Sequence, residues 1–180
     1  MTRDQDAMLV DACLRGDRSA FDELVDRYQG PLFGATYRIT GSVEDAMDAT
    51  QNAFVNAYEK LNTFDPSYRF FSWIYRIAVN QALNLVNKRR PETGFDSNTA
   101  TSSRNPDTEF NRNEASRHLQ RALEEIRPQD RTVIVLKHFE GLSYREIGDL
   151  LEVPEQTVKS RLFTARRRLR EVLIEQGYSL

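Results

Sequence analysis

The chain is poor in the residues that build disulfide-linked or metal-bound folds. It has one cysteine and two histidines among 180 residues, so neither a disulfide framework nor a Cys/His zinc site is possible. The cysteine, Cys13, lies in an apolar run and is expected to be a small buried residue rather than a reactive thiol. No apolar run approaches the roughly 20 residues of a membrane span, and the acidic N-terminus is not a signal peptide. We therefore expect a cytoplasmic protein with no direct membrane insertion and no metal or other cofactor.

Strand-like alternation is also missing, and apolar residues recur instead at helical spacing. A helix is expected to start at a Ser19 cap, to bend or end near Pro31 and to stop by Gly41, and further helices are expected from residues 42, 72 and 128. From residue 91 to 106 the sequence loses all periodicity and fills with Ser, Thr, Asn, Pro and Gly, which is typical of a flexible linker. The predicted fold is all-α, with two small helical domains, residues 1–90 and 107–180, joined by a flexible linker over residues 91–106.

The formal net charge of −2 at first argues against a nucleic-acid partner, but the charges are unevenly placed. Residues 61–90 carry a single acidic side chain, Asp65, among several basic ones, and residues 157–170 carry no acidic side chain at all. Residues 1–60 and 91–114 are acidic. Two basic segments in acidic surroundings indicate DNA contact at two places and a protein partner elsewhere.

Residues 141–173 have the pattern of a helix-turn-helix. Ser143 and Glu146 form a capping box for the first helix, and Pro154 fits the start of the second. The expected buried face of the second helix is Val158, Leu162, Ala165, Leu169 and Val172. Cations and hydroxyls on its other faces suit a major groove. An isolated basic helix is more often a solvated amphipathic helix, but the capped first helix and the tight turn favour DNA binding.

The loop and helix around residues 64–90 carry the residue types that proteins use to bind single-stranded nucleic acid. The loop turns at residues 65–67, and aromatic residues gather around it: Phe64, Tyr68, Phe70, Phe71, Trp73 and Tyr75. Aromatics beside cations can capture unpaired bases, although for Phe64, Phe70 and Trp73 we favour a place in the core. The expected core face of the helix is Ile74, Ile77, Ala78, Gln81 and Leu85. Its outward stripe carries Arg76, Asn80, Asn84, Asn87 and Lys88. Asparagine is a mediocre helix former, so we interpret this stripe as base and phosphate contacts.

The preceding helix, from residue 44 to 61, has no basic residue on its outward face. That face is acidic, amide-rich and partly apolar, and it consists of Asp45, Asp48, Gln51, Asn52 and Val55. From the residues alone, a solvated face and a protein-docking surface are equally good interpretations. The expected core face is Met47, Thr50, Phe54, Ala57 and Leu61.

Together these segments resemble the bacterial sigma factors, specifically their small extracytoplasmic-function group. The resemblance covers nearly the whole chain apart from the linker and the extreme termini, and it rests on four segments in family order: residues 16–28, 44–61, 70–86 and 141–169. It implies a non-enzymatic subunit that gives RNA polymerase its promoter specificity. It also implies core RNA polymerase and promoter DNA, as duplex and as melted non-template strand, as partners, together with an anti-sigma factor.

The resemblance further implies a role for each surface. Polymerase binding falls on Asp45, Asp48, Gln51, Asn52 and Val55. Recognition and melting of the minus-ten element fall on Asp65, Ser67, Tyr68, Arg69, Arg76, Asn80, Asn84 and Lys88. Recognition of the minus-thirty-five element falls on Arg145, Thr157, Lys159, Ser160, Arg161, Phe163, Thr164 and Arg166. Three positions depart from the family pattern. Glu152 replaces the expected turn glycine, Gly148 stands where alanine is usual, and Leu83 falls where some relatives place a basic residue.

Two other classes of protein share parts of this sequence pattern. An autonomous helix-turn-helix regulator, with the first domain as a sensor or dimerisation module, explains the C-terminal segment equally well. It does not explain the second basic segment, the asparagine stripe or the loop aromatics. An enzyme is not favoured, because the carboxylates occur as helix caps and acidic faces with no spacing that indicates a metal site.

Overall fold

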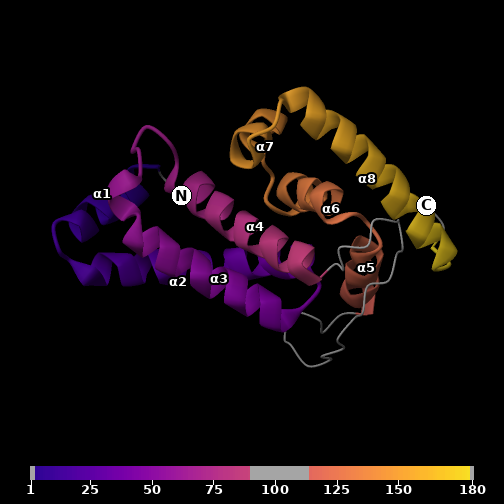
Figure 1. Ribbon diagram of the computed structural model, residues 1–180, viewed down its shortest axis with the longest axis horizontal. Helices are drawn as coiled ribbons and strands as arrows, with labels where there is room; N and C mark the ends of the chain where they lie inside the picture. Colours follow the sequence, from indigo (N-terminus) through magenta and orange to yellow (C-terminus); the bar gives the residue numbers. More distant parts are fainter. Residues whose placement is uncertain (1–2, 90–113, 179–180) are drawn as a thin grey trace.

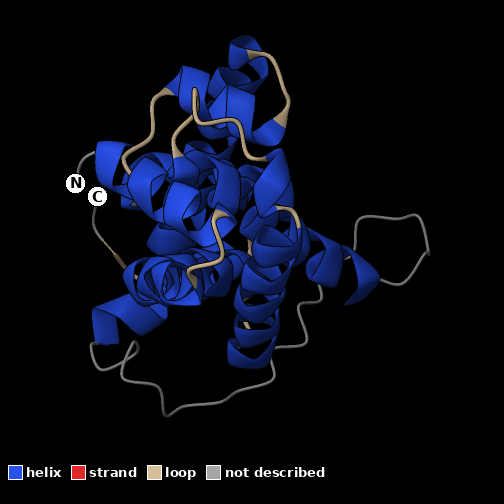
Figure 2. Ribbon diagram, turned by 90° about the vertical axis from the view of Figure 1, so that its left-hand side faces the viewer, coloured by secondary structure: helices blue, strands red, loops and turns tan. Residues whose placement is uncertain are grey.

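The computed structural model describes residues 3–89 and 114–178, and all regular elements in these ranges are helical, as Figure 2 shows. The first range contains α1 (Arg3–Leu14), α2 (Arg18–Thr40), α3 (Val43–Glu59), the 3-10 turn η1 (Leu61–Thr63) and α4 (Phe70–Arg89). The second contains α5 (Glu114–Glu124), α6 (Pro128–Ile134), the π-helical turn η3 (Val135–Phe139), α7 (Tyr144–Leu151) and α8 (Glu155–Glu175). The all-α prediction is confirmed. The predicted linker, residues 91–106, lies outside the described residues, and the domain boundaries stay a prediction.

Short side chains at the helix ends set where α2 and α3 begin and stop. Asp17 caps α2 by accepting hydrogen bonds from the Ser19 amide at 3.0 Å and from the Ser19 hydroxyl at 2.6 Å. The prediction that Ser19 is the cap is therefore wrong, because Ser19 is the donor. The helix continues through Pro31 and ends at Gly41, whose φ of 73° places it in the left-handed region that glycine adopts readily. Ser42 caps α3 as expected.

The first half is a bundle in which α2, α3 and α4 pack against one another. The inward face of α3 carries Ala46, Ala49, Ala53 and Ala57, all fully buried, and these small side chains let the helices approach closely. Met47 was expected in this core but is 59% exposed. It follows Ala46 by one position, which turns it about 100° away from the alanine stripe.

The buried face of α4 is rotated relative to the prediction. Ile74 and Ala78 are buried as expected. Ile77, Gln81 and Leu85 are only partly buried. The remaining fully buried positions of α4 are Phe70, Tyr75, Val79 and Ala82. Tyr75 therefore lies inside the molecule rather than among the exposed loop aromatics.

The second half begins, within the described residues, with α5 and closes around the helix-turn-helix. Pro128 stands in the first turn of α6, where its missing N–H is harmless. The chain then widens into η3 before the loop that leads to α7. The predicted stripe of α8 is confirmed, with Val158, Leu162, Ala165 and Val172 buried and Leu169 partly buried against the core.

The two halves contact each other directly, as Figure 1 shows. Helices α5 and α6 lie against α2, and α7 lies against α4. The Gln120 side chain donates to the Tyr37 carbonyl at 3.4 Å. Glu124 lies so close over Gly41 that a Cβ at position 41 would come within 2.8 Å of its carboxylate. Buried apolar residues of both halves form one continuous cluster, so the halves share an interior.

Candidate nucleic-acid interface

The helix-turn-helix is built by a capping box and an unusual turn. The Ser143 amide donates to the Glu146 carboxylate at 2.8 Å, and the Glu146 amide donates to the Ser143 hydroxyl at 3.2 Å, as predicted. After α7 the chain turns at Glu152, which has φ 55° and ψ 42°. Within residues 3–89 and 114–178 it is the one non-glycine residue with positive φ. This turn brings the Val153 carbonyl over Gly148, where a Cβ would come within 2.8 Å of it. Gly148 and Glu152, two of the departures from the family pattern, therefore belong to one local structure.

The outer face of α8 presents the side chains expected for duplex DNA. Lys159, Ser160, Phe163 and Arg166 are exposed, and Thr157, Arg161 and Thr164 are partly exposed. Phe163 is 68% exposed, although a large aromatic side chain is normally buried. Arg145 is exposed on α7. The structure thus places all eight predicted minus-thirty-five residues on the two helices of this motif.

Two neighbours of this face come from η3 and were not predicted. The His138 Nε2 atom accepts hydrogen bonds from the Arg166 guanidinium at 3.1 and 3.2 Å, so this nitrogen carries no proton. Burial, followed by the positive charges of Arg166 and Lys137, lowers the pKa of His138, which favours the neutral form. The Lys137 ammonium lies 5.0 Å from the Tyr144 ring centre. The His138–Arg166 contact joins residues 28 positions apart in the chain, and no local sequence pattern indicates either contact.

The loop before α4 is a tight turn held by its own side chains. The Asp65 carboxylate accepts from the Ser67 amide at 2.8 Å, and the Asp65 carbonyl accepts from the Tyr68 amide at 3.0 Å. Asp65 and Ser67 therefore help to shape the loop. Tyr68 stands out from it, 65% exposed.

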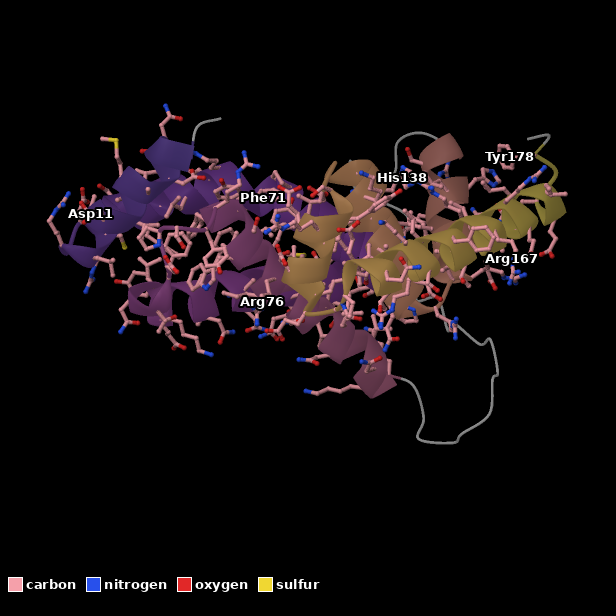
Figure 3. All side chains as sticks on the ribbon, turned by 90° about the horizontal axis from the view of Figure 1, so that it is seen from above. Asp11, Phe71, Arg76, His138, Arg167 and Tyr178 are labelled. Carbon is pink, nitrogen blue, oxygen red and sulfur yellow. The ribbon has the colours of Figure 1, made fainter. Side chains whose placement is uncertain are left out.

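The predicted polar stripe of α4 is largely exposed, but Arg76 in the stripe and Arg69 in the loop before it already have partners. Asn80, Asn84 and Lys88 are exposed. Arg76 forms an ion pair with Glu152 of the helix-turn-helix, and the Arg69 guanidinium lies 3.8 Å from the Glu146 carboxylate. In Figure 3, Arg76 lies where α4 meets the second half of the chain. The predicted minus-ten face and the helix-turn-helix therefore adjoin.

Most of the aromatic residues near the loop are structural. Phe64, Phe70 and Tyr75 are buried, while Phe71 and Trp73 are partly buried. Phe70 and Trp73 ring centres lie 5.7 Å apart, within the range of favourable aromatic pairs. The core interpretation therefore holds for Phe64 and Phe70, and partly for Trp73.

The outward face of α3 carries four of the five predicted polymerase-binding residues. Asp48, Gln51, Asn52 and Val55 are exposed. Asp45 is buried, and its carboxylate accepts from Arg89 at 2.7 Å; burial raises its pKa. Asp45 thus ties α3 to α4 instead of presenting a free carboxylate. Two apolar residues extend the exposed face, Met47 and Tyr58.

The junction of the two halves contains ionisable side chains that are partly buried from solvent. The Tyr75 hydroxyl donates to the Glu140 carboxylate at 2.7 Å, and the Arg38 guanidinium lies 4.2 Å from the Phe139 ring centre. Burial raises the pKa of Glu140, although the hydrogen bond from Tyr75 and the charge of Arg38 oppose that shift. Burial likewise raises the pKa of Glu124.

In the described parts of the chain, none of the helices is both long enough and apolar enough to span a membrane.

Comparison with known proteins identifies the family of the chain. Residues 24–92 match Sigma-70 region 2, and residues 116–169 match Sigma-70, region 4. The chain is 34% identical to the RNA polymerase sigma-H factor of Pseudomonas aeruginosa, over 96% of both proteins. It is 33% identical to the ECF RNA polymerase sigma factor SigW of Bacillus subtilis, over 88% of this chain and 91% of that protein. CnrH, solved in complex with the cytosolic domain of CnrY, has a TM-score of 0.72 and 26% identity, covering 97% of this chain and 99% of that one.

These matches account for both halves of the chain and for their order. An autonomous helix-turn-helix regulator is therefore not favoured. Members of this family are not enzymes. The resemblance stated from the sequence is confirmed: the chain belongs to the extracytoplasmic-function sigma factors, the non-enzymatic specificity subunits of RNA polymerase.

Proposed function

We propose that this sigma factor docks on core RNA polymerase through α3 and guides it to promoters through two separate DNA-binding surfaces. The observation that supports this proposal most strongly is that three exposed surfaces of different chemistry lie on different helices. These are the cation-free face of α3, the asparagine stripe of α4 and the cationic face of α8. A single-site regulator needs only the last of them.

The α3 face suits a protein partner. It combines Asp48, Gln51 and Asn52 with the exposed apolar side chains of Met47 and Val55. Exposed apolar residues bordered by polar ones are typical of a protein interface, and the lack of cations disfavours DNA. We assign this face to core polymerase, with Asp45 holding the helix in place from behind.

The α4 stripe and the loop before it suit the melted minus-ten element. Asn80 and Asn84 offer amide groups to base edges, and Tyr68 offers an exposed ring for an unpaired base. Unpairing bases costs a few kcal/mol, and capture of a flipped base in a pocket offsets that cost only for the right sequence. Melting would then be coupled to recognition.

The α8 face suits the minus-thirty-five element in the major groove. Lys159 and Arg166 carry positive charge for phosphates or guanines, and Ser160, Thr164 and Phe163 can contact base edges. The protein would act in the cytoplasm, where polymerase and promoter DNA are found. CnrH was solved with the cytosolic domain of a second protein, CnrY, and we propose that an anti-sigma factor similarly binds this chain and covers these faces.

Two pairs of substitutions test these assignments. Asn80→Ala with Asn84→Ala should reduce open-complex formation about tenfold or more, on the scale of one to two lost base contacts, and leave core polymerase affinity unchanged. Gln51→Ala with Asn52→Ala should weaken polymerase binding instead. The measurements are permanganate footprinting of melted DNA and titration of labelled protein with core polymerase. Loss of polymerase binding in the first variant, or unchanged polymerase affinity in the second, would contradict the assignment.

A further inference from the structure

The second half of the chain bears an acidic edge that faces basic side chains of the first half. Glu146 on α7 faces Arg69, Glu152 in the turn pairs with Arg76, and Glu140 after η3 accepts from Tyr75 beside Arg38. Three glutamates from one half thus oppose three arginines from the other. This is charge complementarity between two surfaces of one molecule.

Glu152 is the most informative member of this edge. Its left-handed backbone is unfavourable for a residue with a Cβ atom, and glycine would relieve that strain. What Glu152 has and glycine lacks is the carboxylate that pairs with Arg76, 76 positions earlier in the chain. A strained residue that reaches across a junction points to a role for the contact it makes.

We infer that the acidic edge of the helix-turn-helix is an internal partner for the minus-ten face, and that Glu146 and Glu152 occupy Arg69 and Arg76 in place of DNA phosphates when the sigma factor is free. This inference rests on the proposed function, in which the minus-ten face, expected from the sequence to include both arginines, contacts promoter DNA. Phosphates and carboxylates compete for the same guanidinium groups. Binding of the minus-ten element therefore requires the two halves to separate at this edge. In the free protein, the ion pairs keep Arg69 and Arg76 from binding DNA.

Each of these ion pairs is exposed, with 43% and 67% side-chain exposure for Arg76 and Glu152, and exposed pairs are individually weak. The expected effect is therefore a shift in DNA affinity and not a change in fold. The Tyr75–Glu140 hydrogen bond and the shared apolar interior hold the two halves together more firmly than the ion pairs do. When the halves are packed together, the acidic edge determines which side chains of the first half are covered.

The test measures binding of the free full-length protein to a fluorescein-labelled, 20-nucleotide single-stranded DNA of randomised sequence, by anisotropy at low salt. The test variant carries Glu146→Gln and Glu152→Gly. Glutamine at 146 keeps the capping box, and glycine at 152 removes the strain, so this variant should fold at least as stably as the wild type. We expect its affinity to rise at least about threefold, the scale of two lost surface ion pairs. The single variant Glu152→Gln, which keeps the strained backbone but loses the charge, should move in the same direction.

The control variant carries Asp149→Asn and Glu175→Gln, two exposed positions in the same half that lie outside the acidic edge. It changes the net charge by the same amount. Equal affinities for wild type and test variant, or an equal gain in test and control variants, would overturn the inference. A gain with a second single variant, Glu152→Gly, but none with Glu152→Gln would also overturn it, since relief of backbone strain alone would explain the effect. Transcription by the wild type with core polymerase tests the proposed function separately, so the two failures are distinguishable.

Discussion

At the scale of single residues, the junction depends on side chains that are ionisable and largely withdrawn from water. Glu140 accepts from the buried Tyr75 hydroxyl, and Glu124 covers Gly41. Burial disfavours the charged form of a carboxyl group, and it is the main reason that the pKa of both acids is raised. The junction therefore binds protons more tightly when it is formed than when the chain is unfolded.

This linkage gives a signed prediction for Glu140→Gln. Because the pKa of Glu140 in the folded protein lies above its usual value of 4.5, the stability it contributes is complete below that value. It is lost as pH rises through the folded-state value. Glutamine keeps the shape and an oxygen acceptor but does not titrate. The variant should therefore gain stability relative to the wild type as pH rises from about 4 to 8. Urea unfolding at several pH values measures this difference. Glu59→Gln, at an exposed position, should show no such trend, and a parallel trend in both variants would contradict the account.

At the scale of elements, the turn between α7 and α8 explains why this chain has glycine at position 148. The left-handed Glu152 directs the Val153 carbonyl onto the α7 backbone, and the Val153 amide donates to the Gly148 carbonyl at 3.0 Å. A Cβ at 148 would meet that carbonyl at 2.8 Å, whereas a Cβ at Gly30, in the middle of α2, would have no atom within 4 Å apart from its chain neighbours and the backbone of its own helix.

The same substitution should therefore be better tolerated in α2 than in α7. Gly30→Ala gains about 0.5–1 kcal/mol of helix propensity, part of which is offset because a Cβ at this position crowds the ring of Pro31. Gly148→Ala has the same gain but adds overpacking against backbone, which costs about 1–3 kcal/mol, so a net loss of up to about 2 kcal/mol is expected. Chemical denaturation of both variants provides the comparison. Equal stabilisation by both substitutions would mean that the turn relaxes without penalty.

Local signals in the sequence identified most of these elements, and long-range contacts account for what they missed. The Ser143–Glu146 capping box, the stop at Gly41 and the start at Pro128 each depend on residues within one helical turn, which is why they could be predicted. The burial of Tyr75 depends on a partner 65 positions away. The exposure of Met47 depends on how α3 rotates against α2 and α4. Neither is encoded in the local spacing of apolar residues.

The candidate binding surfaces likewise contain features that the local sequence predicts and features that depend on long-range contacts. The exposed residues of α3, α4 and α8 were predictable because polar side chains at helical spacing identify an outward face. That Arg76 meets Glu152, that His138 meets Arg166 and that Asp45 is tied to Arg89 could not be predicted, because each contact joins separate helices.

At the scale of the whole molecule, the two proposed DNA-binding surfaces can act together only when their separation matches that of the promoter elements. Two weak contacts on a tether gain effective concentration when the span fits, and lose it when the span does not. In the free chain the two halves pack together, with α7 against α4. Polymerase would hold them apart, so the spacing between promoter elements would become part of specificity.

The most direct measurement is transcription in vitro from a pool of genomic promoter fragments, with bacterial core RNA polymerase in the presence and absence of this protein. The account predicts discrete new transcripts only when both components are present, with shared sequence elements upstream of their start sites. It also predicts that the protein alone binds those fragments weakly. No new transcripts, together with tight binding of duplex DNA by the protein alone, would contradict it.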